Sequence, residues 1–230
     1  MQKGGFPEYL QFGRSEILQE LLNYIIMRDI VVRYKLRNPK IIKEIALFLI
    51  SNVGVEFSYN SLARTFSLGS TNSAISFVSF LEDSYLLFTV PKFSYSLKKQ
   101  SVNPKKVYVI DNGLADVNSV SFSSNKGRML ENAVFLDLRR NRKEVFYFRN
   151  KKECDFVVKE ENKITQAIQV CYDLNEDNKN REIDGLIEAL ETFNLSEGLI
   201  LTLDQQDTLR IDGKNIKVVP AWRWSEGLHS

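Results

Sequence analysis

Histidine and cysteine are scarce in this sequence. Its 230 residues include one histidine, His229, and two cysteines, Cys154 and Cys171. A histidine next to the end of the chain favours a tail position over a catalytic one. We expect Cys154 to face away from its neighbour Asp155 and Cys171 to face towards it, so a disulfide between the two cysteines is not expected. This cysteine usage predicts a reducing compartment, the cytoplasm.

Three further features are missing. No apolar run approaches the ~20 residues of a membrane-spanning helix, so we expect no membrane partner. The first five residues lack the layout of a signal peptide. The sequence also lacks a Gly-x-x-x-x-Gly-Lys-Ser/Thr loop. Without that phosphate-binding loop, we expect this chain alone neither to bind nor to hydrolyse ATP.

What the chain does contain is typical of a globular protein. Apolar residues make up 43% and charged residues 26% of the sequence, and the formal net charge is +2. A chain of this length can form one large domain or two small ones. The near balance of charge argues neither for nor against a nucleic-acid partner, so any basic footprint has to be local.

The first 38 residues indicate a loop followed by a long helix. Apolar side chains recur at three- and four-residue steps over Glu16–Arg33, which predicts an amphipathic helix whose face needs a partner. The most basic stretch of the chain follows, and we interpret it either as a solvated linker or as a phosphate-contacting patch. It comprises Arg33, Lys35, Arg37, Lys40 and Lys43.

Residues 39–118 predict three helices and a hairpin, which is the order of a winged helix-turn-helix. Ser58 is a suitable N-cap for the second helix, and a turn at Gly69 leads into the third. We expect the two strands of the hairpin over Phe88–Leu97 and Lys105–Asp111.

Candidate DNA contacts lie at the start of the third helix and in the wing. Thr71 and Asn72 can hydrogen-bond phosphates or bases, and Lys98 and Lys99 offer positive charge. The third helix has no lysine or arginine from Thr71 to Leu81 and is apolar on more than one side, which favours packing against protein. DNA contact and protein–protein packing both stay open for this module.

Residues 119–230 follow an α-β-β-β-α-β course, which indicates an α/β layer. Short runs rich in β-branched and aromatic residues predict the strands. We expect helices over 129–140 and 181–193, and strands over 145–148, 154–158, 167–172, 198–203 and 216–220.

Four residues of this segment form a candidate site. Asp155 lies at the mouth of the second strand, and Gln169 and Cys171 share one face of the third. If the two strands pair, an acid faces this pair of side chains, as in many magnesium-dependent nucleases. In a non-catalytic scaffold, by contrast, Asp155 would cap a neighbouring backbone and Cys171 would be a small buried apolar residue. Glu131, on the first helix, would then pair with a nearby cation.

A series of short motifs resembles the C-terminal region of predicted AAA+ superfamily ATPases of archaea and bacteria, with the archaeal branch closer. Each motif is weak alone, but their order is specific, and together they cover nearly the whole chain. The motifs are Gly4–Glu8, Arg28–Val31, Tyr108–Leu114, Gly127–Asn132, Glu153–Val157, Ile168–Tyr172 and the closing Val218–Trp222.

The resemblance implies an α/β chain of three segments. Residues 1–38 would be a helical remnant of the ATPase lid or linker, residues 39–118 an N-terminal winged helix-turn-helix, and residues 119–230 a restriction-endonuclease-like, PD-(D/E)xK domain. The partners implied are DNA, and an ATPase domain upstream in the full-length protein or another protein. The nucleotide-binding core would precede residue 1, so we expect the chain to be an excised or truncated part.

The site carries departures from active PD-(D/E)xK nucleases. In those enzymes acids on the first helix and the second strand hold one or two magnesium ions, and the third strand carries Glu-x-Lys. The resemblance assigns these positions to Glu131, to Asp155, and to Gln169 with Cys171. Gln169 lacks the negative charge, and Cys171 lacks the positive charge that stabilises the reacting phosphate. Candidates for a migrated cation are Lys152, Lys179 and Arg181.

Two function classes follow. The first is a DNA- or protein-binding regulatory module of an archaeal-type AAA+ ATPase, in which the nuclease-like domain is degenerate, inactive and without a cofactor. The second is a magnesium-dependent deoxyribonuclease with an altered site, in which Glu131 and Asp155 hold the metal. The sequence leaves the oligomeric state open.

Overall fold

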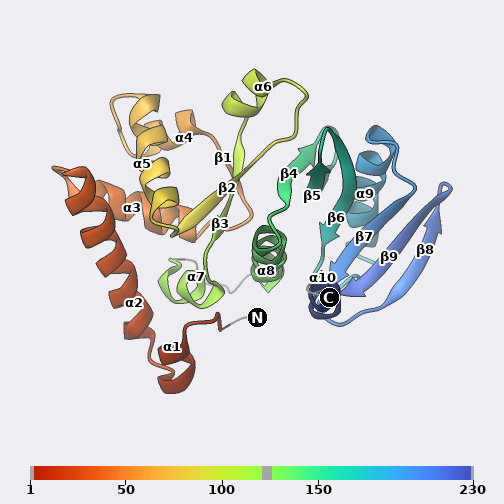
Figure 1. The fold of residues 1–230 in the computed structure, drawn as a ribbon, viewed down its shortest axis with the longest axis horizontal. Helices are drawn as coiled ribbons and strands as arrows, with labels where there is room; N and C mark the ends of the chain where they lie inside the picture. Colours follow the sequence, from red (N-terminus) through yellow and green to blue (C-terminus); the bar gives the residue numbers. More distant parts are fainter. Residues whose placement is uncertain (1–2, 121–125, 229–230) are drawn as a thin grey trace. The chain divides into compact units, whose positions relative to one another are not determined.

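The chain forms two compact units, each built from helices and strands (Figure 1). The computed structural model describes residues 3–120 and 126–228, so His229 lies outside the described residues. The predicted mixed α/β class is confirmed. The first unit consists of residues 1–89 and 102–125, and the second of residues 90–101 and 126–230.

The boundaries of the two units differ from those of the three predicted segments. Residues 1–38 lie in the same unit as the helices that follow them, because α2 (Ser15–Tyr24) packs against α7 (Asn112–Asn118). The chain passes into the second unit within β2 (Leu87–Pro91) and returns to the first after Ser101.

The first unit combines helices with a three-stranded sheet in the order β1-β3-β2. Ser58, Ser70 and Asp111 cap helices with side-chain oxygens that accept backbone N–H groups, as serine and aspartate do at N-caps. Its remaining elements are α1 (Pro7–Phe12), η1 (Ile25–Val32), α3 (Pro39–Ile50), β1 (Glu56–Phe57), α4 (Tyr59–Thr65), α5 (Thr71–Asp83) and β3 (Lys105–Val109).

The long helix predicted over Glu16–Arg33 is continuous but changes its winding. After α2 the chain continues as the π-helix η1. This second stretch is rich in isoleucine and valine, whose branched Cβ atoms crowd the preceding turn of an α-helix. The apolar periodicity therefore predicted the helix correctly, and its wider winding was missed.

The structure differs from the predicted wing in the middle of the hairpin. A strand was expected over Phe88–Leu97, but β2 ends at Pro91, where the proline has no N–H to continue a ladder. The predicted break at Lys98–Pro104 contains a short helix, α6 (Leu97–Val102). Lys98 and Lys99 thus lie on a helix and not in an extended loop.

Two of the sequence motifs meet at Asp111. Its Oδ2 accepts a hydrogen bond from the Gly5 N–H at 2.6 Å, and its Oδ1 accepts one from the Leu114 N–H at 2.8 Å. A Cβ added at Gly4, where φ is +72°, would collide with this carboxylate. The glycines near the start of the chain therefore permit the close approach of this segment to the cap of α7.

The second unit is built on a six-stranded mixed sheet in the order β4-β5-β6-β7-β9-β8. Its β4–β5, β5–β6 and β8–β9 pairs are antiparallel, and its β6–β7 and β7–β9 pairs are parallel. The elements are α8 (Lys126–Arg140), β4 (Glu144–Arg149), β5 (Glu153–Glu160), β6 (Lys163–Val170), α9 (Lys179–Thr192), β7 (Glu197–Thr202), β8 (Asp207–Ile211), β9 (Lys214–Pro220) and α10 (Ala221–Leu228).

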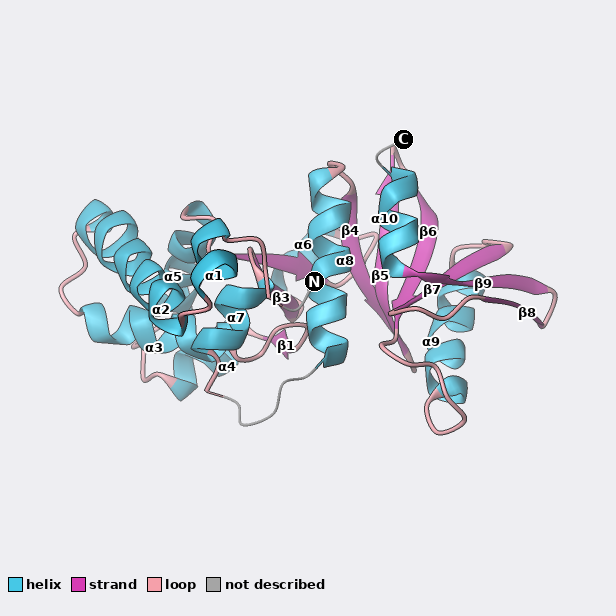
Figure 2. Cartoon of the chain, turned by 90° about the horizontal axis from the view of Figure 1, so that it is seen from below, coloured by secondary structure: helices cyan, strands magenta, loops and turns pink. Residues whose placement is uncertain are grey.

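Helices cover both faces of this sheet. α9 packs on β5 and β6, whereas α8 and α10 contact each other and lie on the other side of the strands (Figure 2). At Gly185 of α9 a Cβ would collide with the backbone oxygen of Glu153, so the helix approaches β5 as closely as only glycine allows. Cys154 and Cys171 are both buried and are not bonded to each other. None of the helices described is long and apolar enough to span a bilayer.

Candidate functional site

Asp155 and Gln169 are brought together by the pairing of β5 with β6. The strands are antiparallel, with Phe156 opposite Ile168, so the residues just before and just after this pair are neighbours. The Asp155 N–H donates to Oε1 of Gln169 at 3.2 Å, and Oδ2 of Asp155 accepts from the Val170 N–H at 3.0 Å. Both side chains are buried.

The sequence reasoning missed a third member of this site, Glu182 of α9. Its Oε2 accepts a hydrogen bond from Nε2 of Gln169 at 2.6 Å, and the carboxylate is buried with only 5% of the residue exposed. A signal was present, because Glu182 precedes Leu186 by four residues and so shares the apolar stripe that packs on the sheet. An acid on a buried stripe needs a partner, and Gln169 is one.

Arg181 supplies the positive charge next to this network. Its Nε and Nη2 donate to Oε1 of Glu182 at 3.0 and 2.5 Å. This hydrogen bond, and then the charge of Glu182, raise the pKa of the guanidinium, and Cys171 and Asp155 act on it in the same direction. Arg181 was one of the three candidates for a migrated cation.

Cys171 lies one residue beyond β6 and not within the strand, although its N–H continues the ladder to the carbonyl of Leu201 at 2.9 Å. The thiol donates to the carbonyl of Asp173 at 3.2 Å, and the amide of Asn178 donates to the sulfur at 3.5 Å. Burial, followed by the charge of Glu182, raises the pKa of Cys171 to about 11. The sulfur is therefore a neutral thiol at neutral pH.

Glu131 is on α8 and is buried, with 8% of the residue exposed. One helical turn later Phe135 stacks on Phe156, at 6.4 Å between ring centroids, which ties this helix to the strand that carries Asp155. Among the residues that the structure describes, no three of His, Cys, Asp and Glu converge to hold a metal ion. Of the candidate donors, the carboxylates of Glu131 and Asp155 and the amide oxygen of Gln169 are of the kind that magnesium takes, whereas the Cys171 thiol is not.

The four candidate DNA contacts fall in different units. Thr71 and Asn72 begin α5 in the first unit; Oγ1 of Thr71 donates to Oδ1 of Asn60 at 2.6 Å, and Asn72 is exposed. Lys98 and Lys99 are exposed on α6, in the part of the chain that belongs to the second unit.

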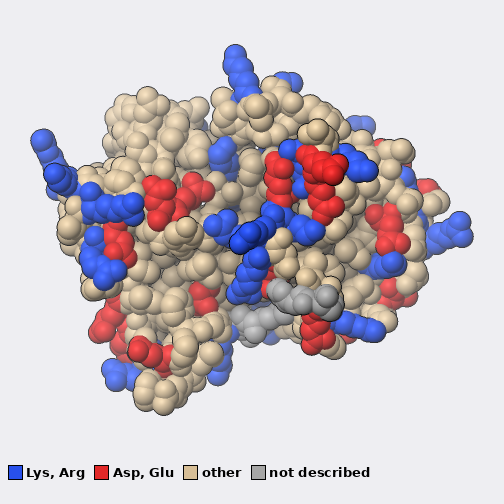
Figure 3. Space-filling view, viewed as in Figure 1, with Lys and Arg blue, Asp and Glu red and all other residues tan. Residues whose placement is uncertain are grey.

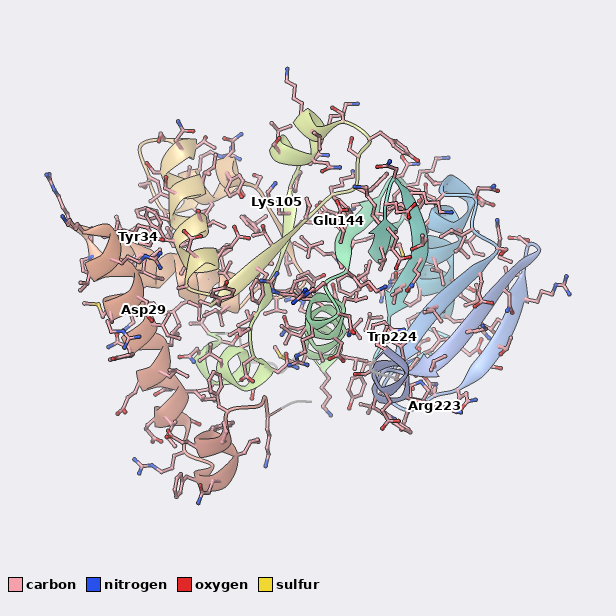
Figure 4. All side chains as sticks on the ribbon, viewed as in Figure 1. Asp29, Tyr34, Lys105, Glu144, Arg223 and Trp224 are labelled. Carbon is pink, nitrogen blue, oxygen red and sulfur yellow. The ribbon has the colours of Figure 1, made fainter. Side chains whose placement is uncertain are left out.

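One side of α5 is covered by protein. The ring of Tyr34, labelled in Figure 4, stacks on Phe80 at 3.8 Å between centroids, and its hydroxyl donates to Oδ2 of Asp83 at 2.8 Å. This contact explains why the helix is apolar on more than one side. The contact covers the ring of Phe80, which would face solvent if α5 were an exposed recognition helix.

Two domain models match the sequence. The domain of unknown function DUF8612 matches residues 1–122, and the domain of unknown function DUF4143 matches residues 126–224. No solved structure matches the chain.

Two curated relatives match nearly all of the chain. The uncharacterized protein MJ1544 of Methanocaldococcus jannaschii is 38% identical over 243 residues, which cover 96% of this chain and 53% of the relative. An uncharacterized protein of Haemophilus influenzae is 25% identical over 227 residues, which cover 95% of this chain and 55% of the relative. The chain therefore spans about half the length of the curated relatives it matches.

Proposed function

The chain belongs to the DUF8612 family, and we propose that it is a DNA- or protein-binding regulatory module of an archaeal-type AAA+ ATPase. In this proposal the first unit is a winged helix-turn-helix. The second unit is a PD-(D/E)xK nuclease-like domain that has lost catalysis. The ATPase itself, whether upstream in a longer chain or a separate protein, is the partner that the module regulates in the cytoplasm.

One observation carries the loss of catalysis, namely the closed polar network around Gln169. The Gln169 side chain accepts from the backbone N–H of Asp155 and donates to the carboxylate of Glu182, which in turn accepts from Arg181. Metal-dependent phosphodiester cleavage needs carboxylate oxygens directed at the ion. Here the Glu182 carboxylate accepts from the Gln169 amide and from Arg181, and the Asp155 carboxylate accepts from the Val170 N–H, so both acids serve as acceptors within a structural network.

The winged-helix interpretation is supported by the first unit. α4 and α5 are consecutive helices joined by a turn through Gly69, and the strands β1, β3 and β2 form one small sheet. The stacking of Tyr34 on Phe80 favours protein packing over DNA contact for part of α5. Asn72 at the start of the helix is exposed, so its side chain can still contact DNA in this proposal.

The test is a cleavage assay on supercoiled plasmid and branched DNA with magnesium or manganese. We expect no cleavage by the chain, and no difference between the wild type and Asp155→Asn. The matched control is Asp204→Asn, at an exposed aspartate of the same unit. Cleavage that Asp155→Asn abolishes and Asp204→Asn leaves intact would overturn the proposal.

Such a result would support the second candidate, a metal-dependent DNA endonuclease with an altered PD-(D/E)xK site. The observation that favours it is Arg181, whose guanidinium bonds Glu182 next to Gln169 and whose pKa is raised by that bond and by the charges of Glu182 and Asp155, so that a positive charge is available where active nucleases have lysine. For this candidate Arg181→Ala would lower cleavage, whereas Arg210→Ala, at an exposed arginine of β8, would not.

A further inference from the structure

The second unit contains a groove that the candidate site does not use. Its volume is about 760 Å³, and three segments of the chain line it: residues 93–100 before and within α6, residues 159–165 at the turn between β5 and β6, and residues 192–195 at the end of α9. All three segments belong to the second unit.

The groove has an aromatic base held in place by the sheet. The Phe93 N–H donates to the carbonyl of Tyr147 on β4 at 2.8 Å. The Phe93 ring meets Phe193 edge-to-face at 5.0 Å and Tyr95 at 5.1 Å between centroids. Tyr95 itself is 84% exposed. An exposed aromatic ring that rests edge-to-face on an anchored one is a stacking surface for a planar ligand.

The charge of the groove has one sign. Lys159 and Lys163 line it, and no Asp or Glu does so among the residues described. Lys159 is paired with Glu144, labelled in Figure 4, at 3.0 Å, so the net positive charge of the lining comes from Lys163. Lys98 and Lys99 are exposed on α6 and are not in the lining, which this helix contributes through Leu97 and Gln100, so the two lysines flank the groove.

The residues that neighbour α6 in the sequence also include no acidic ones. Residues 90–101, the stretch around α6 that belongs to the second unit, contain three lysines and no aspartate or glutamate. Figure 3 shows basic and no acidic side chains over α6 on the face drawn, whereas acidic and basic side chains alternate over β4 and β5. The wall of the groove formed by α6 is therefore suited to an anionic ligand.

We propose that this groove binds single-stranded nucleic acid, with a base stacked on Tyr95 and the backbone phosphates next to Lys98, Lys99 and Lys163. An exposed aromatic ring beside exposed cations matches a ligand that alternates planar rings with negative charges. Duplex DNA keeps its bases stacked on one another and offers no free ring to Tyr95. The inference rests on the proposed function in so far as it names the ligand of the same regulatory module.

Binding is measured by fluorescence anisotropy with a labelled oligothymidylate, in EDTA, using the whole chain. Tyr95→Ala is expected to weaken binding roughly 5- to 150-fold, since one base loses its stacking partner. Tyr85→Ala is the matched control, because Tyr85 is a 64% exposed tyrosine of the first unit, and it should bind as the wild type does.

The lysines are tested by salt dependence. Replacing Lys98 and Lys99 together by alanine should reduce the slope of log K against log salt by about 1.4, or ~0.7 for each phosphate of the single strand that a lysine no longer neutralises. A double Lys151→Ala and Lys152→Ala variant, at exposed lysines away from the groove lining, should keep the wild-type slope.

Three outcomes would overturn the inference. Tyr95→Ala could leave the affinity for oligothymidylate unchanged, or the chain could bind a duplex of the same length as tightly as the single strand. The third outcome is that the groove binds only an acidic, tyrosine-containing peptide and no oligothymidylate. Because EDTA removes divalent metals, none of these outcomes depends on whether the chain cleaves DNA. Failure of the inference is thus separable from failure of the proposed function, which the cleavage assay decides.

Discussion

The amide of Gln169 donates a hydrogen bond to the carboxylate of Glu182, with 2.6 Å between Nε2 and Oε2. One residue comes from β6 and the other from α9, and both are buried. A glutamate at position 169 would place a second carboxylate at hydrogen-bond distance from Glu182. The acid of α9 therefore makes an amide, and not a second acid, the compatible side chain at position 169.

Replacing Gln169 by glutamate should consequently destabilise the protein in a pH-dependent way. Two buried carboxylates in contact raise the pKa of the pair in the folded state, so the folded form of Gln169→Glu is favoured at low pH and loses stability as pH rises. At neutral pH we expect a loss of about 1–3 kcal/mol, similar to that of an unsatisfied buried polar group. Urea unfolding measures the free energy of unfolding at neutral pH and at mildly acidic pH, where the loss should be smaller.

The control for this variant is Gln166→Glu, which changes the same residue type on the same strand at a partly exposed position. It should change the free energy of unfolding little at either pH. A Gln169→Glu variant as stable as the wild type at neutral pH would mean that the network around Glu182 rearranges, contrary to a rigid structural role.

Cys171 should make stability fall at alkaline pH. Burial raises its pKa to about 11, whereas the unfolded thiol has the ordinary value of 9.0. Between these values the unfolded chain loses its proton and the folded chain keeps it, so the stabilising contribution is complete below about pH 9 and is lost as pH rises through about 11. Urea unfolding across this range should show a steeper decline for the wild type than for Cys171→Ser, whose hydroxyl does not titrate there.

The same raised pKa predicts slow alkylation of Cys171 in the native protein. Iodoacetamide attacks the thiolate, which is a minor species at neutral pH. Both cysteines are buried, so we expect neither to be modified at neutral pH until denaturant is added. Rapid modification of one thiol in the native protein, followed by mass spectrometry that assigns it to Cys171, would contradict the described environment.

The segment that begins with Gly4 is expected to depend on Asp111. Gly4 and Gly13 both have positive φ, of +72° and +66°, but a Cβ at Gly4 would meet the Asp111 carboxylate, whereas one at Gly13 would meet nothing within 4 Å. Both alanine variants carry the cost of the left-handed backbone, about 1–2 kcal/mol. Gly4→Ala should in addition lose the Gly5–Asp111 hydrogen bond, for a further ~1.5–3 kcal/mol.

Thermal or urea unfolding of these two variants gives the difference directly. Limited proteolysis adds a local readout, since release of the first residues from α7 exposes them to cleavage. If Gly4→Ala were no less stable and no more protease-sensitive than Gly13→Ala, the docking of this segment on Asp111 would be excluded.

Parts of the fold could be predicted because their burial leaves a period in the sequence. The apolar stripe of α9 and the continuous apolar run of β7 are examples, and pairing of β5 with β6 followed from their adjacency. β8 was missed because Asp207–Ile211 is an edge strand without a buried residue. α6 was missed for the same reason, since none of its six residues is buried.

The candidate site was predictable only along the strands. Asp155 and Gln169 could be joined from sequence, because antiparallel neighbours are set by register. The partner of Gln169 on α9 depends on how a helix thirteen residues away packs on the sheet, which no local pattern specifies. The position of Glu182 on an apolar stripe was the available clue, and a rule that flags acids on such stripes would have found it.

The packing of α9 on β5 can be tested by replacing each of two glycines with alanine. The two substitutions should change the free energy of unfolding in opposite directions. Gly185 of α9 is buried, and a Cβ there would collide with the backbone oxygen of Glu153. Because that atom belongs to a strand in the middle of the second unit, it cannot yield as a side-chain end would. Gly185→Ala should therefore force α9 away from the sheet and cost about 1–3 kcal/mol, the usual penalty of overpacking.

Gly227 of α10 is the matched comparison. It is helical and exposed, and a Cβ there would meet nothing within 4 Å. Gly227→Ala should stabilise the protein by about 0.4–1 kcal/mol, since alanine reduces the freedom of the unfolded chain and fits a helix. Urea unfolding of the two variants, at equal m-value, measures these opposite signs. If Gly185→Ala were also stabilising, α9 would have to lie farther from β5, and the contact between Gln169 and Glu182 that closes the polar network could not have the geometry described.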